Sequence, residues 1–275
     1  MSRKLFGTDG IRGRVGEYPM TAEFALRLAS AAGHVLAPGG GKVLIGKDTR
    51  VSGYMFESAL EAGFVAAGMD VLLVGPLPTP GIAYLTRTLG ANVGVVISAS
   101  HNPYEDNGIK FFDANGGKLS DAIETAIEAR LSEPAVTRES GSLGRAKRVE
   151  NALDTYQAFC ISTVPRDLRL DGLKIVIDCS HGAAYKVAPR VLSELGAEIV
   201  PIGCSPNGRN INDSCGSTQP ELLQLTTQGV RADLGIALDG DGDRVLMVDH
   251  NGQLVDGDQL LCVLASAWHR SDQLV

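Results

Sequence analysis

Two short polar segments carry the side chains in this sequence that could do chemistry, and each follows an apolar run. After Val93–Ile97 comes Ser-Ala-Ser-His-Asn-Pro, which places the hydroxyl of Ser100 at the end of an expected strand. After Leu234–Leu238 come three aspartates that alternate with glycines. Because α/β proteins bind ligands beyond the carboxyl ends of their strands, we interpret these segments as a candidate nucleophile and a candidate metal site.

The aspartates of the second segment are Asp239, Asp241 and Asp243. The glycines between them permit a tight backbone, so the three carboxylates can converge on one point. Like charges this close repel, so either a divalent cation lies among them, with magnesium expected, or at least one pKa is displaced. A calcium-binding EF-hand loop fits poorly, because Arg244 and His250 stand where it needs glycine and glutamate. An ordinary acidic turn is the structural alternative.

The segment around Ser100, taken alone, is explained equally well as a turn, because Ser, His, Asn and Pro are common turn formers. A strand expected at Ile109–Phe112 would carry Lys110 back to the same end of the sheet. A lysine there could neutralise a phosphate on the serine or carry a proton. Of the histidines, His101 is the one with a reactive neighbour in the sequence.

Composition limits the classes of function that this chain could have. Its 275 residues suggest about two domains. A net charge of −7 without clustered Lys and Arg argues against nucleic acid as a partner. We find no signal peptide and no apolar run long enough to span a membrane, and the five cysteines form no C-x-x-C pair. We therefore expect a soluble, cytoplasmic protein with reduced thiols and no membrane partner.

Apolar runs that alternate with amphipathic segments predict an α/β fold. The expected strands are Val43–Ile45, Asp70–Val74, Val93–Ile97, Lys174–Ile177, Glu198–Ile202 and Leu234–Leu238. The expected helices are Ala22–Leu36, Gly53–Ala67, Thr79–Leu89, Ala188–Leu195 and Gln219–Gln228, with a further helix from Asp258. The polar stretch 132–150 breaks the alternation and indicates a connection between domains. We predict domains at 1–150 and 151–257, followed by the start of a third at 258–275.

Several motifs together resemble the α-D-phosphohexomutase family. They are Phe-Gly-Thr-Asp-Gly-Ile-Arg-Gly at Phe6–Gly13, Lys47–Arg50, Ile97–Pro103, Asn107–Lys110 and Asp239–Arg244, which occur in the family's order across nearly the whole chain. The resemblance implies two tandem three-layer α/β/α domains with mixed, mostly parallel sheets, which carry the phosphoserine loop and the metal-binding loop. The opening motif, with Lys47–Arg50, is most similar to the bacterial branch that acts on glucosamine phosphates.

The resemblance also implies a mechanism. Ser100 would carry a phosphoryl group and exchange it with a sugar phosphate through a bisphosphorylated intermediate, so that glucosamine 6-phosphate becomes glucosamine 1-phosphate. Glucosamine or glucose 1,6-bisphosphate would serve as intermediate or activator. One magnesium ion would be held by Asp239, Asp241, Asp243 and an oxygen at Ser100. A phosphoserine adds a charge of about −1.5 to −2, so this cluster needs a cation.

The remaining roles come from the same resemblance. Arg12 and Arg244 would bind the transferring phosphoryl group, and Lys110, with His101, would manage the hydroxyl proton. The family has third and fourth domains that recognise the sugar and grip its other phosphate. We interpret 258–275 as the first helix of that third domain, and so expect this chain to bind magnesium but turn over slowly by itself.

Three alternatives stay open at this point. Within the family, glucose or mannose phosphates could be the substrate instead of a hexosamine phosphate. Outside it, phosphatases with an Asp-x-Asp-x-Thr/Val motif use the first aspartate as nucleophile; Asp239 and Asp241 fit that motif, whereas Asp243 does not. A non-catalytic metal-binding module is the third. A homo-oligomer is compatible with each of them.

Overall fold

The computed structural model describes residues 5–270, with side chains up to residue 267. The elements of the first half are β1 (Ile11–Arg14), α1 (Ala22–Leu36), β2 (Gly41–Lys47), α2 (Ser52–Ala66), β3 (Met69–Pro76), α3 (Thr79–Thr88), β4 (Val93–Ile97), β5 (Asp106–Phe112), α4 (Asp121–Arg130), a 3₁₀ turn (Ser140–Ser142) and β6 (Ala146–Arg148). Those of the second half are α5 (Ala152–Ser162), β7 (Lys174–Asp178), α6 (Val187–Glu194), β8 (Glu198–Ile202), α7 (Glu221–Gly229), β9 (Leu234–Leu238), β10 (Val245–Asp249), β11 (Leu254–Val255) and α8 (Gly257–Arg270).

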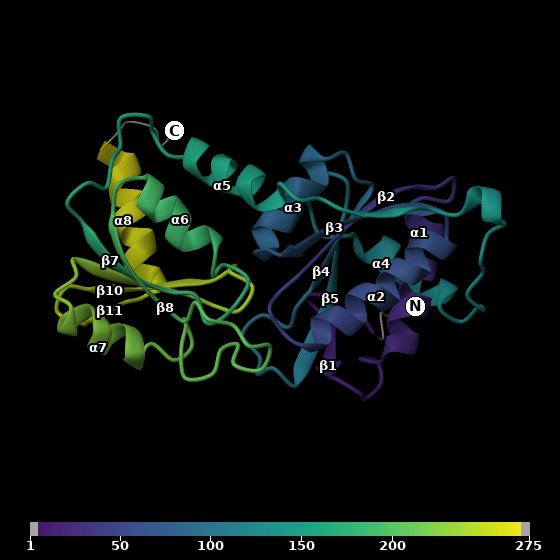
Figure 1. Ribbon diagram of the computed structural model, residues 1–275, viewed down its shortest axis with the longest axis horizontal. Helices are drawn as coiled ribbons and strands as arrows, with labels where there is room; N and C mark the ends of the chain where they lie inside the picture. The colour runs from purple at the N-terminus through teal and green to yellow at the C-terminus, as the bar shows by residue number, and fades with distance from the viewer. Residues whose placement is uncertain (1–4, 271–275) are drawn as a thin grey trace.

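The first sheet has the strand order β1-β5-β4-β2-β3-β6. Strands β4, β2, β3 and β6 are parallel, whereas β5 and β1 run antiparallel at one edge. Helices α1 and α2 pack together on one face, where Leu28, Phe56 and Phe64 are fully buried against Ile45 and Val95. Helix α3 covers the other face (Figure 1). The central strands contain continuous apolar runs because helices cover both faces of the sheet.

The second sheet has the order β11-β10-β9-β7-β8, with β9, β7 and β8 parallel and the other two strands antiparallel. Helix α7 lies on one face, where Leu223 packs against Val176 and Ala237, and α6 lies on the other (Figure 1). Helix α5 runs from the first sheet towards the second, and its Phe159 stacks on Tyr84 of α3 with ring centroids 3.8 Å apart. Both sheets are therefore mixed, as the fold class predicts.

Each expected strand and helix forms in the structure, with ends shifted by a few residues. The sequence analysis missed β1, α4, β6, α5, β10 and β11. Strand β6 lies inside the polar stretch 132–150 and pairs with β3 at the sheet edge. Its three residues are all exposed, so no apolar alternation marks it. The helix expected from Asp258 is α8; residues 271–275 of that expectation lie outside the described residues.

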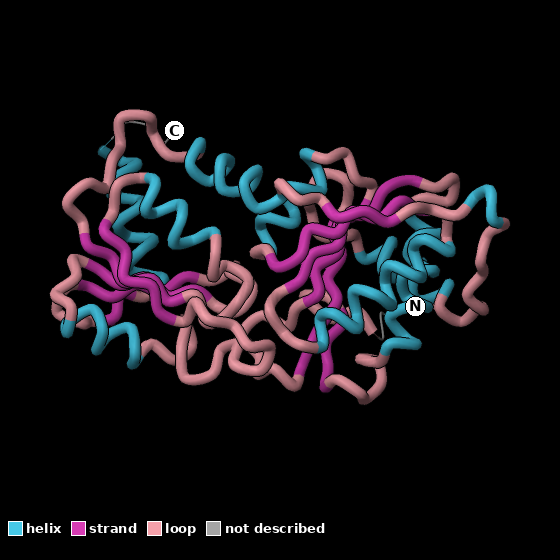
Figure 2. The backbone as a smooth tube through the Cα atoms, viewed as in Figure 1, coloured by secondary structure: helices cyan, strands magenta, loops and turns pink. Residues whose placement is uncertain are grey.

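The arrangement of the two sheets positions the candidate site. In Figure 2 the loops that follow the parallel strands of each sheet lie between the two magenta sheets. Thr49, after β2, donates its hydroxyl to the His181 carbonyl at 2.5 Å, and Val51 N–H donates to the Gly208 carbonyl at 2.8 Å. The carboxyl ends of both parallel sets thus face one another, which brings the serine loop to the aspartates. No described helix is long and apolar enough to cross a membrane.

Candidate active site

Ser100 occupies a tight, buried turn directly after β4. Its φ is 54°, in the left-handed region that non-glycine residues rarely adopt, and the residue is 1% exposed. The backbone N–H of Ser100 donates to the Ser98 hydroxyl at 2.9 Å, and its own hydroxyl donates to Asp239 Oδ2 at 2.6 Å. Backbone strain of this kind persists where surrounding contacts hold it, often at functional residues. The structure therefore aims the Ser100 hydroxyl at the acidic loop.

The acidic loop gathers its three carboxylates around one point, as the sequence predicts. Ligand atoms of Asp239, Asp241 and Asp243 all lie within 4.8 Å of one another. Asp239 and Asp241 are buried, and Asp241 Oδ1 is a buried acceptor with no hydrogen-bond partner in the described part of the chain. A buried carboxylate oxygen without a partner is costly unless something fills its coordination. The residues present therefore fit a hard divalent cation bound by oxygen.

The electrostatics of the loop also favour a cation. Burial, together with the neighbouring charge of Asp241, raises the pKa of Asp239 to about 6. Burial and Asp241 likewise raise the pKa of Asp243. Both shifts show that ionised carboxylates repel one another here and lack solvent. A bound cation would remove this repulsion and favour the charged form of each carboxylate.

Lys110 lies in the centre of the site rather than at its rim. Its Nζ is 2.8 Å from Asp241 Oδ2, 2.9 Å from Asp9 Oδ2 and 3.6 Å from Asp243 Oδ2. Burial by itself would lower the pKa of Lys110, but the ion pairs with Asp241 and Asp9 outweigh it and raise that pKa. Lys110 is therefore a fixed positive charge at neutral pH.

Arg12 and His101 line the same site. Arg12 Nη1 donates to the Ala99 carbonyl at 3.4 Å, its guanidinium pairs with Asp9, and its buried Nε has no partner among the described residues. Burial, with the positive charges of Arg244 and Arg12, lowers the pKa of His101, so the imidazole is neutral at pH 7. Arg244 is exposed, and its backbone N–H donates to Asp239 Oδ1 at 3.2 Å. The structure thus brings together every residue that the sequence nominated for the site.

Sequence reasoning missed several residues that complete this arrangement. Thr79, at the start of α3, donates its hydroxyl to Asp241 Oδ2 at 2.7 Å and its N–H to the Asp241 carbonyl at 2.8 Å. Asp9 pairs with both Lys110 and Arg12. Asp9 lies within the opening motif, so its position could have been flagged, but no pattern in the sequence pairs Thr79 with the acidic loop.

Comparisons with known proteins agree with this geometry. Profiles described as phosphoglucomutase/phosphomannomutase, alpha/beta/alpha domain I and domain II match residues 3–137 and 154–252. Phosphoglucosamine mutase of Chromobacterium violaceum is 60% identical over 271 residues, which is 97% of this chain and 61% of that protein. The protein of the same name from Aeromonas hydrophila is 58% identical over 275 residues, or 100% of this chain and 62% of that protein.

The chain therefore spans less than two thirds of the length of these relatives. Among solved structures, a putative phosphomannomutase from Thermus thermophilus superimposes with a TM-score of 0.85 at 28% identity, covering 98% of this chain and 63% of that one. The two profile matches occur in the order of the two sheets and include Ser100 in the first and the three aspartates in the second. This chain belongs to the phosphoglucomutase/phosphomannomutase family.

Proposed function

We propose that this chain contributes the phosphoserine and metal centre of a phosphoglucosamine mutase, which interconverts glucosamine 6-phosphate and glucosamine 1-phosphate. The observation that carries the proposal is the 2.6 Å hydrogen bond from the Ser100 hydroxyl to Asp239 within the three-aspartate cluster. Relatives at 58% and 60% identity bear the name phosphoglucosamine mutase, which favours glucosamine over other hexoses. The product would serve amino-sugar nucleotide and cell-wall precursor synthesis.

In the proposed reaction Ser100 carries a phosphoryl group at rest. Its P–O bond to the serine breaks as a sugar hydroxyl oxygen bonds to phosphorus, which gives a hexose 1,6-bisphosphate and a free serine. After the sugar reorients, the serine takes the other phosphoryl group back. Each hydroxyl oxygen that attacks loses a proton, and each oxygen that leaves gains one, so the site must hold and return a proton.

The described side chains support a division of these tasks. Neutral His101 can accept a proton, whereas protonated Lys110 neutralises charge and can donate a hydrogen bond. Arg12 and Arg244 offer guanidinium groups that match phosphoryl oxygens. Phosphoryl transfer depends mainly on such positioning and charge stabilisation.

Asp239, Asp241 and Asp243, together with an oxygen of the serine phosphate, would hold magnesium, which supplies charge neutralisation to the phosphoryl group. Buried Asp241 Oδ1, which has no hydrogen-bond partner among residues 5–267, supports this assignment. Lys110 complements the cation, because it already balances part of the negative charge before any ion binds.

Two other interpretations of the site have less support. The solved relative from Thermus thermophilus is titled a putative phosphomannomutase, which supports mannose phosphate as the alternative substrate. A phosphatase with Asp239 as nucleophile would leave the buried Ser100 hydroxyl, which donates to Asp239 Oδ2 at 2.6 Å, without a role in the chemistry.

The test is phosphate loading of Ser100, followed by intact mass and peptide mapping after incubation with glucose or glucosamine 1,6-bisphosphate and Mg²⁺. We expect one acid-stable phosphate on Ser100, loss of it in Ser100→Ala, and no change in the control Ser132→Ala, whose exposed hydroxyl donates to the Ala129 carbonyl. An acid-labile phosphate on Asp239 would instead establish the phosphatase alternative. Transfer of the loaded phosphate to glucosamine 6-phosphate, rather than to glucose or mannose 6-phosphate, checks the sugar.

A further inference from the structure

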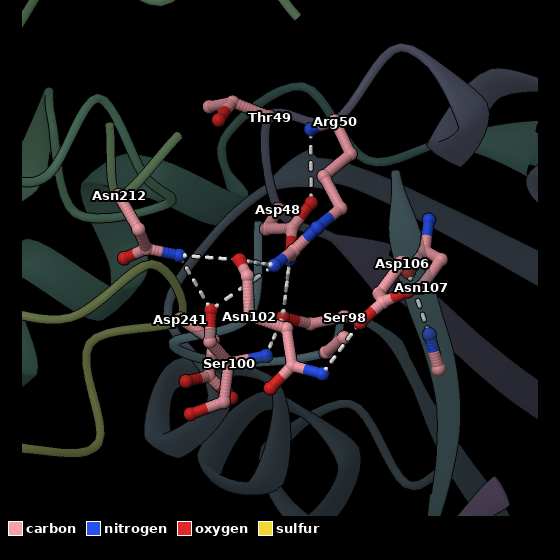
Figure 3. A network of polar contacts seen from close by, with 12 residues as sticks. Asp48, Thr49, Arg50, Ser98, Ser100, Asn102, Asp106, Asn107, Asn212 and Asp241 are labelled. Carbon is pink, nitrogen blue, oxygen red and sulfur yellow. Dashed lines mark hydrogen bonds and ion pairs between the residues drawn. The ribbon is translucent and has the colours of Figure 1, made fainter. Parts of the chain in front are cut away.

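Two side chains from different parts of the fold converge on the same pair of carbonyl oxygens in the Ser100 loop. Arg50 Nη2 donates to the Ser100 carbonyl at 3.2 Å and to the Asn102 carbonyl at 2.6 Å. Asn212 Nδ2 donates to the same two oxygens at 2.9 and 3.0 Å. Figure 3 shows both side chains reaching the loop, with Asn212 arriving from the second sheet's side.

These contacts use both lone pairs of each of the two carbonyl oxygens. A carbonyl oxygen has two lone pairs, so each of the two oxygens receives one hydrogen from Arg50 and one from Asn212. The peptide planes that follow Ser100 and Asn102 are thereby fixed. Because Ser100 has a φ of 54°, the loop needs such outside contacts to stay in that conformation.

The contact from Arg50 comes from the first sheet, and buried partners hold the Arg50 side chain in place. Arg50 is fully buried, and its guanidinium pairs with Asp48, whose Oδ2 also accepts the Ser98 hydroxyl at 2.5 Å. The chain from β2 therefore holds one side of the serine loop whether or not the second sheet is docked.

The contact from Asn212 depends on the position of the second sheet. Asn212 is 7% exposed, has a φ of 57°, and its N–H donates to the Ser180 carbonyl at 2.9 Å. Gly240 of the acidic loop passes directly over this contact, since a Cβ there would lie 2.6 Å from the Ser100 carbonyl and 2.8 Å from Asn212 Nδ2. Asn212 and the three aspartates therefore reach the serine loop together or not at all.

We propose that Asn212 is a positioning residue, which makes the reactive conformation of Ser100 conditional on docking of the domain that carries the metal loop. Arg50 is its counterpart within the first domain. The inference rests on the proposed phosphoserine function and adds to it a residue that contacts neither the reacting oxygen nor the metal site. Ser100 is then held in its reactive conformation only when the acidic loop is docked beside it, where the loop's bound cation would neutralise the phosphate.

The test compares two Asn212 variants, a matched control and an Arg50 variant of this chain. Asn212→Asp keeps the shape and tolerates a positive φ, but replaces the donating NH₂ by an oxygen that faces two carbonyls. Asn212→Gly keeps the backbone conformation and removes the side chain without adding a charge. The matched control is Asn207→Asp in the same loop, because the Asn207 side-chain oxygen accepts from Arg209 N–H, and an aspartate retains that oxygen.

Two measurements are made on each variant: the rate of Ser100 phosphorylation by glucose 1,6-bisphosphate with Mg²⁺, and backbone amide hydrogen exchange across residues 98–108. We expect both Asn212 variants to load phosphate roughly ten- to a hundredfold more slowly, with faster exchange confined to that segment. Affinity for Mg²⁺ and exchange in β2 should match the control. A purely structural role would instead lower stability and protection throughout the chain.

The outcomes separate this inference from the proposed function. If the unsubstituted chain loads phosphate and both Asn212 variants load at the control rate, the positioning role is wrong. If the unsubstituted chain takes no phosphate on Ser100, the proposed function fails. Amide hydrogen exchange then tests the positioning role by itself, and unchanged protection of residues 98–108 in both Asn212 variants overturns that role. Arg50→Lys, which keeps the charge beside Asp48 but cannot reach both carbonyls, should slow loading in the same way.

Discussion

At the residue scale, the carboxylate of Asp239 accepts a hydrogen bond from Ser100, but in the absence of a cation its ionised form is unfavourable. Its Oδ2 accepts the Ser100 hydroxyl at 2.6 Å, yet its pKa is raised to about 6 by burial and by Asp241. A folded-state pKa above the ordinary 3.8 means that the folded protein binds this proton more tightly than the unfolded chain. The group therefore destabilises the metal-free fold increasingly as pH rises from about 4 to about 6.

The direction of this pH dependence of stability gives the first prediction. Because Mg²⁺ would bind the ionised form of the Asp239 carboxylate, we expect Mg²⁺ to raise the melting temperature more at about pH 7.5 than at about pH 5. Thermal unfolding at both pH values, with Mg²⁺ and with a chelator, measures the difference. In Asp239→Asn, which cannot ionise, the contribution of this group to the pH dependence should vanish. Equal Mg²⁺ shifts at both pH values in the unsubstituted chain would contradict the prediction.

The second prediction concerns the buried charge pair of Lys110 and Asp241, whose side chains are 3% and 1% exposed. Lys110→Met leaves Asp241 buried without its counter-charge, which should lower the free energy of unfolding by about 3 to 5 kcal/mol without metal. Mg²⁺ should recover part of this loss, because it becomes the main positive charge at the site. Arg190→Met, whose ion pair with Asp154 is exposed on both sides, is the control and should change stability by less than about 1 kcal/mol. Chemical denaturation with and without Mg²⁺ measures both.

At the element scale, the turns after the parallel strands touch backbone to backbone. A Cβ on Gly182 would lie 2.3 Å from the Gly240 carbonyl oxygen, and one on Gly240 would lie 2.6 Å from the Ser100 carbonyl oxygen. The turn after β7, the acidic loop after β9 and the serine loop after β4 are therefore stacked closely. This stacking explains the glycine at 240 independently of metal binding.

The third prediction tests that stacking. Gly240→Ala should force the acidic loop away from the serine loop, cost about 1 to 3 kcal/mol of stability and slow phosphorylation of Ser100. Gly229→Ala, at the end of α7 where a Cβ meets nothing within 4 Å, is the matched control and should be neutral or slightly stabilising. Denaturation and phosphate loading measure the two effects. Loading of Gly240→Ala at the control rate would show that the close contact is unnecessary.

At the scale of the whole molecule, the polar contacts between the two halves converge on the site, beside a buried apolar cluster that includes Ile82 of α3, Tyr156 of α5 and Val187 of α6. Thr79 on α3 holds the acidic loop through both its hydroxyl and its N–H. The hydrogen bonds of Thr49, Val51 and Asn212 also join the two halves.

The fourth prediction follows from this interface. Thr79→Val removes the hydroxyl that Asp241 accepts while keeping the side-chain shape, so we expect a loss of about 1 to 2 kcal/mol and weaker coupling of the two domains. Calorimetry should show a broader or divided unfolding transition. Thr88→Val on the same helix loses only a bond to the Tyr84 carbonyl and serves as the control. A single transition of unchanged width and midpoint in Thr79→Val would contradict the prediction.

Local patterns made much of the fold predictable. Helix α1 begins and ends at the predicted residues, because Thr21 caps it and its apolar residues repeat at helical spacing. The central parallel strands were found because they are apolar runs covered on both faces. Strands β6 and β11 were missed, since they have three and two residues and owe their existence to a neighbouring strand.

For the site, the sequence by itself nominated the candidate groups that the structure brings together. Ser100, Lys110 and the three aspartates each belong to a short motif beside a strand, and strand ends are where α/β folds place ligands. Only the tertiary structure decided how these groups are held. Asn212 and Ser100 are 112 positions apart in the chain and Thr79 and Asp241 are 162 apart. No local periodicity relates such residues, and they meet only because the carboxyl ends of two separate sheets face one another.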